Sequence, residues 1–259
     1  MQAIKKRVIY SVVALLAVIV ISIPLFFLYF EKSTTPQKKP ELLNYKIVAL
    51  GDSLTEGIGD LENQGYVGAT YKALKKKKNV KHVIIRDLGH QGDTSSDLLK
   101  KLKQPKFIES IKESNTVFLT IGGNDLVHVF KQHFLNLRQS DFTNQRKIFS
   151  SNLKKILHEI RQLNPDAPIY YFGLYNPFED YLGKANKDFV PILNEWNANS
   201  KQIGKNFEPI SFVPTSDLFK GKTDSLLYDD HFHPNKEGYA KMSQRLLQYI
   251  NKSNANKQH

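Results

Sequence analysis

The sequence of 259 residues contains no cysteine. Disulfide bonds, thiolate metal sites and a cysteine nucleophile are therefore excluded. The chain also lacks a G-x-S-x-G motif around Ser53, because Thr55 stands where the last glycine would be. No internal repeat is visible, and no aromatic residue interleaves the lysines at 75–78, so we expect no nucleic-acid partner.

Charge is absent from a long stretch near the N-terminus. Three basic residues, Lys5 to Arg7, precede 23 uncharged residues that run from Val8 to Phe30. At about 1.5 Å per residue a helix of this length spans roughly 34 Å, which is enough to cross a bilayer. The basic residues favour a cytoplasmic segment 1–7, and we predict a transmembrane signal anchor at 8–30. The alternative, a cleaved signal peptide, would end in small residues, whereas this run ends L-F-F-L-Y-F.

Everything after the predicted anchor is expected to lie outside the cell membrane. The whole chain has a formal charge of +12; the three basic residues before the anchor contribute 3 of this, which leaves +9 for residues 31–259. A basic outer domain suits contact with lipid headgroups or cell-envelope polyanions, although such a charge also serves plain solubility. We predict a polar linker at 31–43, a folded outer domain at 44–252 and a polar tail at 253–259.

Short apolar runs alternate with helical patterns through the outer domain. The pattern predicts strands at 45–50, 81–86, 116–121, 168–172 and 209–213. It predicts helices at 66–76, 95–103, 126–163 with a break near Ser140, 188–203 and 236–250. This alternation is typical of an α/β domain of three layers, α/β/α, with a central parallel sheet of about five strands.

Four polar segments follow predicted strands or precede the last helix. They are G-D-S-L at 51–54, the loop at 88–94 that contains Gly92, G-G-N-D at 122–125 and Y-D-D-H-F-H-P-N at 228–235. The carboxyl ends of parallel strands meet at one edge, so these segments are expected to gather there. Together they supply what acyl transfer needs: a hydroxyl nucleophile, a histidine base, an acid that orients it and donors for an oxyanion.

These four segments resemble the SGNH, or GDSL, hydrolase family over roughly residues 45–250. The resemblance implies a flavodoxin-like fold, with Ser53 as nucleophile, His233 as base and Asp230 as the acid that orients it. It also implies an oxyanion hole made by the backbone N–H groups of Ser53 and Gly92 and by the side chain of Asn124. It implies an ester substrate, which is a lipid, a short-chain acyl ester or an acetylated envelope glycan, and no cofactor. Many members carry asparagine where this chain has Asp87.

Less specific interpretations stay open beside this one. Asp229, His231 and His233 have a spacing that can bind zinc, which would make the chain a metal-dependent hydrolase. The chain could instead be a non-catalytic module that binds the cell envelope. His231 rivals His233 as base, and Asp229 rivals Asp230.

The remaining conspicuous side chains have plainer interpretations. We expect Asp52 to hydrogen-bond within its turn, and Asn124 and Asp125 are both suited to capping the next helix. His90 is expected in an exposed loop or facing the pocket. We expect the aromatic side chains at Tyr175, Phe178 and Trp196 to serve packing. The sequence indicates no oligomeric state.

Overall fold

The computed structural model describes residues 42–133 and 138–256, together with Lys6, Tyr10, residues 18–27 and Tyr29. Contacts divide the chain into two units, Met1–Glu41 and Leu42–His259. In the first unit residues 18–27 are helical. None of the helices in the described residues is both long and apolar enough to cross a membrane, and part of the predicted anchor lies outside those residues. The predicted linker also lies outside them, except for its last two residues, 42 and 43.

The second unit is built on a sheet of five parallel strands in the order β2-β1-β3-β4-β5. The strands are β1 (Leu43–Gly51), β2 (Val80–Gly89), β3 (Thr116–Thr120), β4 (Ile169–Phe172) and β5 (Ile210–Val213). All five predicted strands are thus confirmed, as is the parallel sheet. β1 begins one residue inside the predicted linker because Leu43 already pairs with Val80 of β2. This strand order reverses direction between β1 and β3, where open α/β folds bind their ligands.

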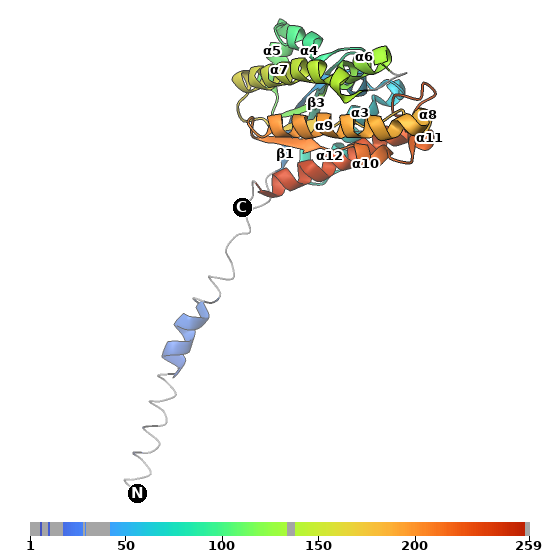
Figure 1. The fold of residues 1–259 in the computed structure, drawn as a ribbon. Coiled ribbons are helices and arrows are strands. Elements are labelled where there is room, and N and C mark those ends of the chain that lie inside the picture. The colour runs from blue at the N-terminus through green and yellow to red at the C-terminus, as the bar shows by residue number, and fades with distance from the viewer. Residues whose placement is uncertain are drawn as a thin grey trace. The chain divides into compact units, whose positions relative to one another are not determined.

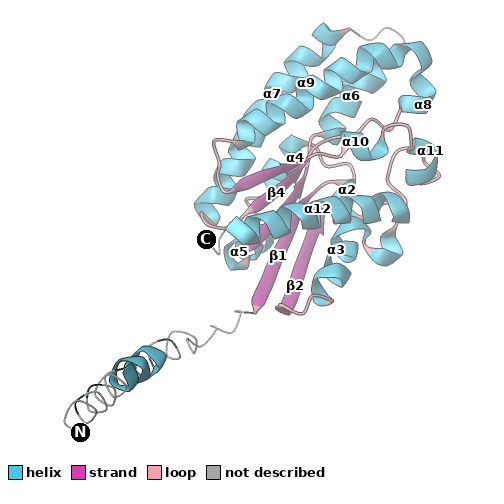
Figure 2. Ribbon diagram, turned by 90° about the horizontal axis from the view of Figure 1, so that it is seen from below, coloured by secondary structure: helices cyan, strands magenta, loops and turns pink. Residues whose placement is uncertain are grey.

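Helices cover both faces of the sheet (Figures 1 and 2). One face packs against α4 (Ser95–Lys101), α5 (Pro105–Glu113), α6 (Gly123–His133), α7 (Gln139–Leu163) and α9 (Asn186–Gly204). The other packs against α3 (Gly65–Lys75), α10 (Ser216–Phe219), α11 (Thr223–Leu226) and α12 (Lys236–Asn256). Strand β1 shows why: Val48 and Leu50 face the first layer, while Ile47 and Ala49 face the second. The three-layer prediction is confirmed.

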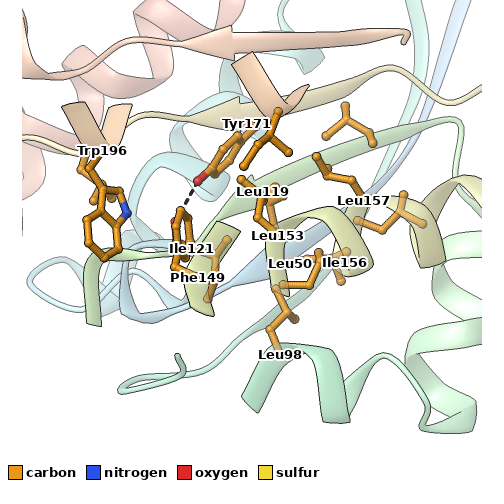
Figure 3. Packing of buried hydrophobic residues seen from close by; sticks show 14 of the residues in the cluster. Leu50, Leu98, Leu119, Ile121, Phe149, Leu153, Ile156, Leu157, Tyr171 and Trp196 are labelled. Carbon is orange, nitrogen blue, oxygen red and sulfur yellow. Dashed lines mark hydrogen bonds between the residues drawn. The ribbon is translucent and has the colours of Figure 1, made fainter. Parts of the chain in front are cut away.

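The long helical pattern at 126–163 forms α6 and α7, which are separated near the predicted break. Helix α7 buries Phe149, Leu153, Ile156 and Ile160, a spacing of three and four residues that makes one apolar stripe. Figure 3 shows Phe149, Leu153 and Ile156 of this stripe near Leu50 and Leu119 of the sheet. Most of this segment is therefore a layer of the core. Trp196 of α9 is buried and stacks on Phe149 at 5.1 Å between ring centroids, which confirms its packing role.

Besides several helices of four residues that were not predicted, two longer helices differ from the predictions. Helix α5 was not predicted; Pro105 begins it, and Phe107 and Ile111 are buried one turn apart. Helix α12 continues to Asn256, into the residues predicted as the polar tail. The Asn254 side chain donates a hydrogen bond to the Tyr45 hydroxyl at 2.7 Å, which ties this polar end of the helix to β1.

Short helices occupy the connections at the carboxyl edge of the sheet. They are α2 (Ser53–Glu56), the 3₁₀ turns η1 (Leu61–Asn63) and η2 (Gly183–Ala185), and α8 (Glu179–Leu182). Helix α2 directly follows β1, so Ser53 is its first residue. The first of the four polar segments is therefore a strand-to-helix turn at the switch point of the sheet.

Candidate active site

The turn after β1 holds Ser53 in a fixed position. Gly51 has a φ of +144°, and a Cβ atom there would lie 2.1 Å from the carbonyl oxygen of Thr120, so only glycine fits. Asp52 caps α2: its Oδ1 accepts hydrogen bonds from the Leu54 N–H at 3.1 Å and the Thr120 hydroxyl at 2.8 Å. Burial raises the pKa of Asp52. The predicted turn role of Asp52 is confirmed, and Ser53 itself is only 4% exposed.

The segment before α12 brings a histidine and an acid to Ser53. His233 Nε2 lies 2.8 Å from Ser53 Oγ, and His233 Nδ1 lies 2.6 Å from Asp230 Oδ2. The other carboxylate oxygen of Asp230 accepts hydrogen bonds from the backbone N–H groups of Phe232 at 3.0 Å and His233 at 2.9 Å. Burial alone would raise the pKa of Asp230, but the hydrogen bonds from the His233 ring and the two backbone groups lower it below its ordinary value. The structure thus aligns the serine, the histidine and the acid in the predicted order.

A tyrosine outside the four segments holds this turn. Tyr175 follows β4, and its hydroxyl donates a hydrogen bond to the carbonyl oxygen of Phe232 at 2.6 Å. Its ring is buried and stacks on Phe219 at 4.1 Å between centroids. Packing was predicted for Tyr175, and the structure adds a contact one residue before His233. No local pattern in the sequence indicates this contact, because the two residues are 57 positions apart.

The two remaining predicted residues lie in two loops that a hydrogen bond joins. Gly92 lies in the loop after β2 with a φ of +84°, a left-handed conformation that favours glycine, and a Cβ there would meet no atom within 4 Å. The amide nitrogen of Asn124, at the start of α6, donates a hydrogen bond to the carbonyl oxygen of Asp93 at 2.9 Å. Asn124 therefore joins the loop after β3 to the loop that carries Gly92.

Further bonds fix the loop after β3. The carboxylate of Asp125 accepts hydrogen bonds from the backbone N–H of Ser95 at 2.8 Å and the Ser95 hydroxyl at 2.6 Å. The Tyr171 hydroxyl donates to the carbonyl oxygen of Ile121 at 3.1 Å, drawn as a dashed line in Figure 3. Hydrogen bonds therefore tie Ile121 and Asp125, which lie on either side of Asn124 in the sequence, to β4 and α4.

The structure does not gather the residues of the alternative metal cluster. Asp229 and His231 are exposed, and the His231 ring packs at 5.1 Å from the Tyr181 ring. Both ring nitrogens of His233 face other partners, Asp230 and Ser53. Within residues 42–133 and 138–256 no three or more histidine, aspartate and glutamate side chains are grouped to hold a metal ion. His90, the other histidine considered, is exposed, with Nδ1 at 3.2 Å from Asp93 Oδ1.

A cavity of about 760 Å³ lies beside α9. Residues from the loop after β4 through α9, and from α10, line it, and they include Asn176, Lys184, Lys187 and Asp217. None of Ser53, Asp230 and His233 belongs to its lining. We place the candidate site by its hydrogen-bonded groups, since volume alone supplies no chemistry.

Comparison with known proteins agrees with this geometry. Residues 49–241 match the GDSL-like lipase/acylhydrolase family. The chain is 39% identical over 208 residues to the protein YpmR of Bacillus subtilis strain 168, covering 80% of this chain and 81% of that protein. It is 26% identical over 213 residues to the spore germination lipase LipC of Bacillus licheniformis, covering 79% and 95%.

A solved structure gives the same result. The lipase Lip_vut3 from a goat rumen metagenome superposes with a TM-score of 0.66 at 26% sequence identity, covering 78% of this chain and 95% of that one. The family match spans most of the compact unit that carries Ser53. The chain therefore belongs to the GDSL-like lipase/acylhydrolase family and is a serine ester hydrolase.

Proposed function

We propose that this protein cleaves carboxylic esters through an acyl-enzyme on Ser53, with His233 as base and Asp230 as the residue that orients it. The observation that carries the proposal is the unbroken chain of contacts, 2.8 Å from Ser53 Oγ to His233 Nε2 and 2.6 Å from His233 Nδ1 to Asp230 Oδ2. A serine hydroxyl becomes an effective nucleophile only when a base within hydrogen-bond reach removes its proton.

In the first step Ser53 Oγ forms a bond to the ester carbonyl carbon while its proton moves to His233 Nε2. The carbonyl oxygen becomes an oxyanion, and Asp230 stabilises the imidazolium that has formed. When the tetrahedral intermediate collapses, the bond to the alcohol oxygen breaks and the alcohol takes the proton from Nε2. Water repeats the sequence on the acyl-enzyme, which releases the acid and restores Ser53.

Donors for the oxyanion are proposed at the backbone N–H groups of Ser53 and Gly92 and at the side chain of Asn124. Two features support this assignment. The space beside Gly92 is open, with no atom within 4 Å of a Cβ built there. Asn124 donates a hydrogen bond to the carbonyl oxygen of Asp93, which is the residue after Gly92. This bond links the loops that carry the two proposed donors, Gly92 and Asn124.

The substrates covered by the proposal are lipids, short-chain acyl esters and acetylated glycans of the cell envelope. The name of LipC, a spore germination lipase, supports the first of these. We also propose that the protein is a single-pass membrane protein with its catalytic domain outside the cell. The uncharged run from Val8 to Phe30 and the basic residues before it support that placement.

The function is tested by the hydrolysis of p-nitrophenyl acetate and butyrate by the purified full-length chain, beside Ser53→Ala, each with and without EDTA. We expect turnover that the substitution abolishes and the chelator leaves unchanged. A phosphonate probe should add its mass to the wild-type chain and not to Ser53→Ala. Turnover that survives the substitution but stops with EDTA would refute the serine mechanism.

The placement has a separate test. Carbonate extraction of membranes should leave the full chain in the pellet, and protease added to intact cells freed of their wall should digest the catalytic domain. A chain that is released by carbonate, or that is protected from the protease, would contradict the proposed anchor and orientation.

A further inference from the structure

Hydrogen bonds hold the loop that carries Gly92 at both of its ends. The His90 N–H donates to the carbonyl oxygen of Gly51 at 3.0 Å. At the other end the Asp93 carboxylate lies 2.6 Å from Lys101 Nζ, and the Asp93 carbonyl accepts the Asn124 bond. Between these anchors the backbone N–H of Gln91 points to a different element, where it donates a short hydrogen bond to the carboxylate of Glu56.

Glu56 belongs to the same short helix as Ser53. It is the last residue of α2, three positions after the nucleophile, and its side chain is half-buried. Its own N–H donates to the carbonyl oxygen of Asp52 at 3.1 Å. The helix also lies close to the end of β2, where the loop begins, because a Cβ on Gly89 would lie 2.3 Å from the backbone nitrogen of Glu56. Glu56 is therefore rigidly connected to Ser53 on one side and bonded to the loop on the other.

Packing cannot orient Gly92 by itself. The residue has no side chain, is exposed, and has no neighbour within 4 Å of a Cβ position. The direction of its N–H is consequently set by the bonds that its chain neighbours make. Gln91 and Asp93 are those neighbours, and the bond from Gln91 to Glu56 is the one that leads back to the nucleophile's helix.

We propose that Glu56 is a positioning residue, whose carboxylate holds the Gln91 N–H and thereby sets the Gly92 N–H relative to Ser53. This inference rests on the proposed function, in which Gly92 donates to the oxyanion. Glu56 does not touch the reacting atoms. It acts through the backbone of the loop, so its effect belongs to the transition state, where the oxyanion exists, more than to substrate binding.

The other charged groups around Glu56 are compatible with this role. Asp87 at the end of β2 accepts the Gly89 N–H at 2.9 Å, and burial, with a smaller contribution from the Glu56 charge, raises the pKa of Asp87 to about 6. His90 on the loop is exposed and pairs with Asp93. The described residues show no cation bonded to Glu56. The backbone N–H of Gln91 is thus the partner that the structure gives this carboxylate.

The experiment compares Glu56→Ala, Glu56→Gln and a matched control, Glu62→Ala, in the full-length chain. Glu62 is a nearby exposed acid in η1, and its removal changes the charge equally. We expect Glu56→Ala to lower kcat for p-nitrophenyl butyrate by about 10- to 100-fold with KM within about twofold, since losing an oxyanion donor outright costs about 10²- to 10³-fold. Glu56→Gln keeps an acceptor oxygen and should retain kcat within about threefold, as should the control.

Hydrogen exchange gives a readout that does not depend on catalysis. The Gln91 amide should be protected in the wild type, Glu56→Gln and Glu62→Ala, and should exchange at least about tenfold faster in Glu56→Ala. An unchanged kcat in Glu56→Ala, a rise in KM alone, or an unprotected Gln91 amide in the wild type would each overturn the inference. A third outcome separates the inference from the proposed function: the Gln91 amide is protected in the wild type, but neither the wild type nor any variant hydrolyses an ester. In that case the proposed function fails, while the hydrogen bond from Gln91 to Glu56 is confirmed.

Discussion

Removing the Tyr175 hydroxyl tests whether the turn that carries His233 depends on a residue outside the family segments. Tyr175→Phe deletes the 2.6 Å hydrogen bond to the Phe232 carbonyl oxygen and keeps the ring, which stacks on Phe219. The cavity created is no larger than one oxygen atom. The change therefore isolates one buried hydrogen bond in the loop between Asp230 and His233.

The magnitude follows from the burial of both partners. Tyr175 is 8% exposed, so its loss leaves the Phe232 carbonyl with one fewer partner and costs about 1–3 kcal/mol of unfolding free energy. For a unit of this size each kcal/mol lowers Tm by about 2–4 °C. Relaxation of the turn moves the adjacent His233 ring from its 2.8 Å contact with Ser53. Because a misplacement of about 1 Å can cost up to 10²-fold in rate, we expect kcat to fall by about tenfold.

The assay pairs thermal unfolding with ester hydrolysis and uses Tyr170→Phe as its control. Tyr170 is a buried tyrosine in β4, and its hydroxyl interacts with Ser253 near the end of α12 instead of with the site. Both variants should lose a similar amount of stability, but only Tyr175→Phe should lose kcat. Equal activity in the two variants, or a loss in Tyr170→Phe alone, would refute the reasoning.

Two further predictions concern acids near the site. Asp230→Asn should lower kcat by about 10³- to 10⁴-fold with little change in KM, because an amide does not hold the His233 ring in the productive tautomer; a loss below tenfold in the p-nitrophenyl butyrate assay would contradict this. Asp87 has its pKa raised to about 6 in the folded state, above the unfolded value of about 3.9, so the native chain binds more protons between these values and wild-type stability falls as the pH rises through that window. Asp87→Asn removes this loss, so its Tm relative to the wild type should be higher at pH 7.5 than at pH 4; a difference independent of pH would rule out the buried charge as its cause.

The sequence predicted those parts of the structure that depend on local patterns of residues. Five apolar runs and the spacing of buried residues in α7 and α12 fixed the layers, because each strand or helix must bury one face. Short motifs predicted the site residues because each lies at the end of a strand or the start of a helix. Asp230 and His233 are three residues apart, so one turn suffices to bring them together.

Local patterns could not predict contacts between segments that lie far apart in the sequence. The bond between Tyr175 and Phe232 joins residues 57 positions apart, and the bond from Gln91 to Glu56 joins residues 35 positions apart. In the sequence Tyr175 is one of 12 tyrosines and Glu56 a common acid in a turn. The end of α12 was predicted to be a tail because its residues are polar, and the bond that ties it to Tyr45 spans 209 residues of the sequence. Only the folded sheet brings these pairs together.

The distance along the chain between Ser53 and His233 has a consequence for the protein's synthesis. These residues are 180 positions apart. The last helix, α12, packs on the face of the sheet that carries Ile47 and Ala49 of β1, and it begins only at Lys236. Because the chain is made from its N-terminus, it holds the proposed nucleophile long before it holds the proposed base, and the domain folds as a unit. With the roles proposed above, a chain that ends before His233 is expected to be inert toward esters, and the newly made protein is expected to become an esterase only after His233 has left the ribosome.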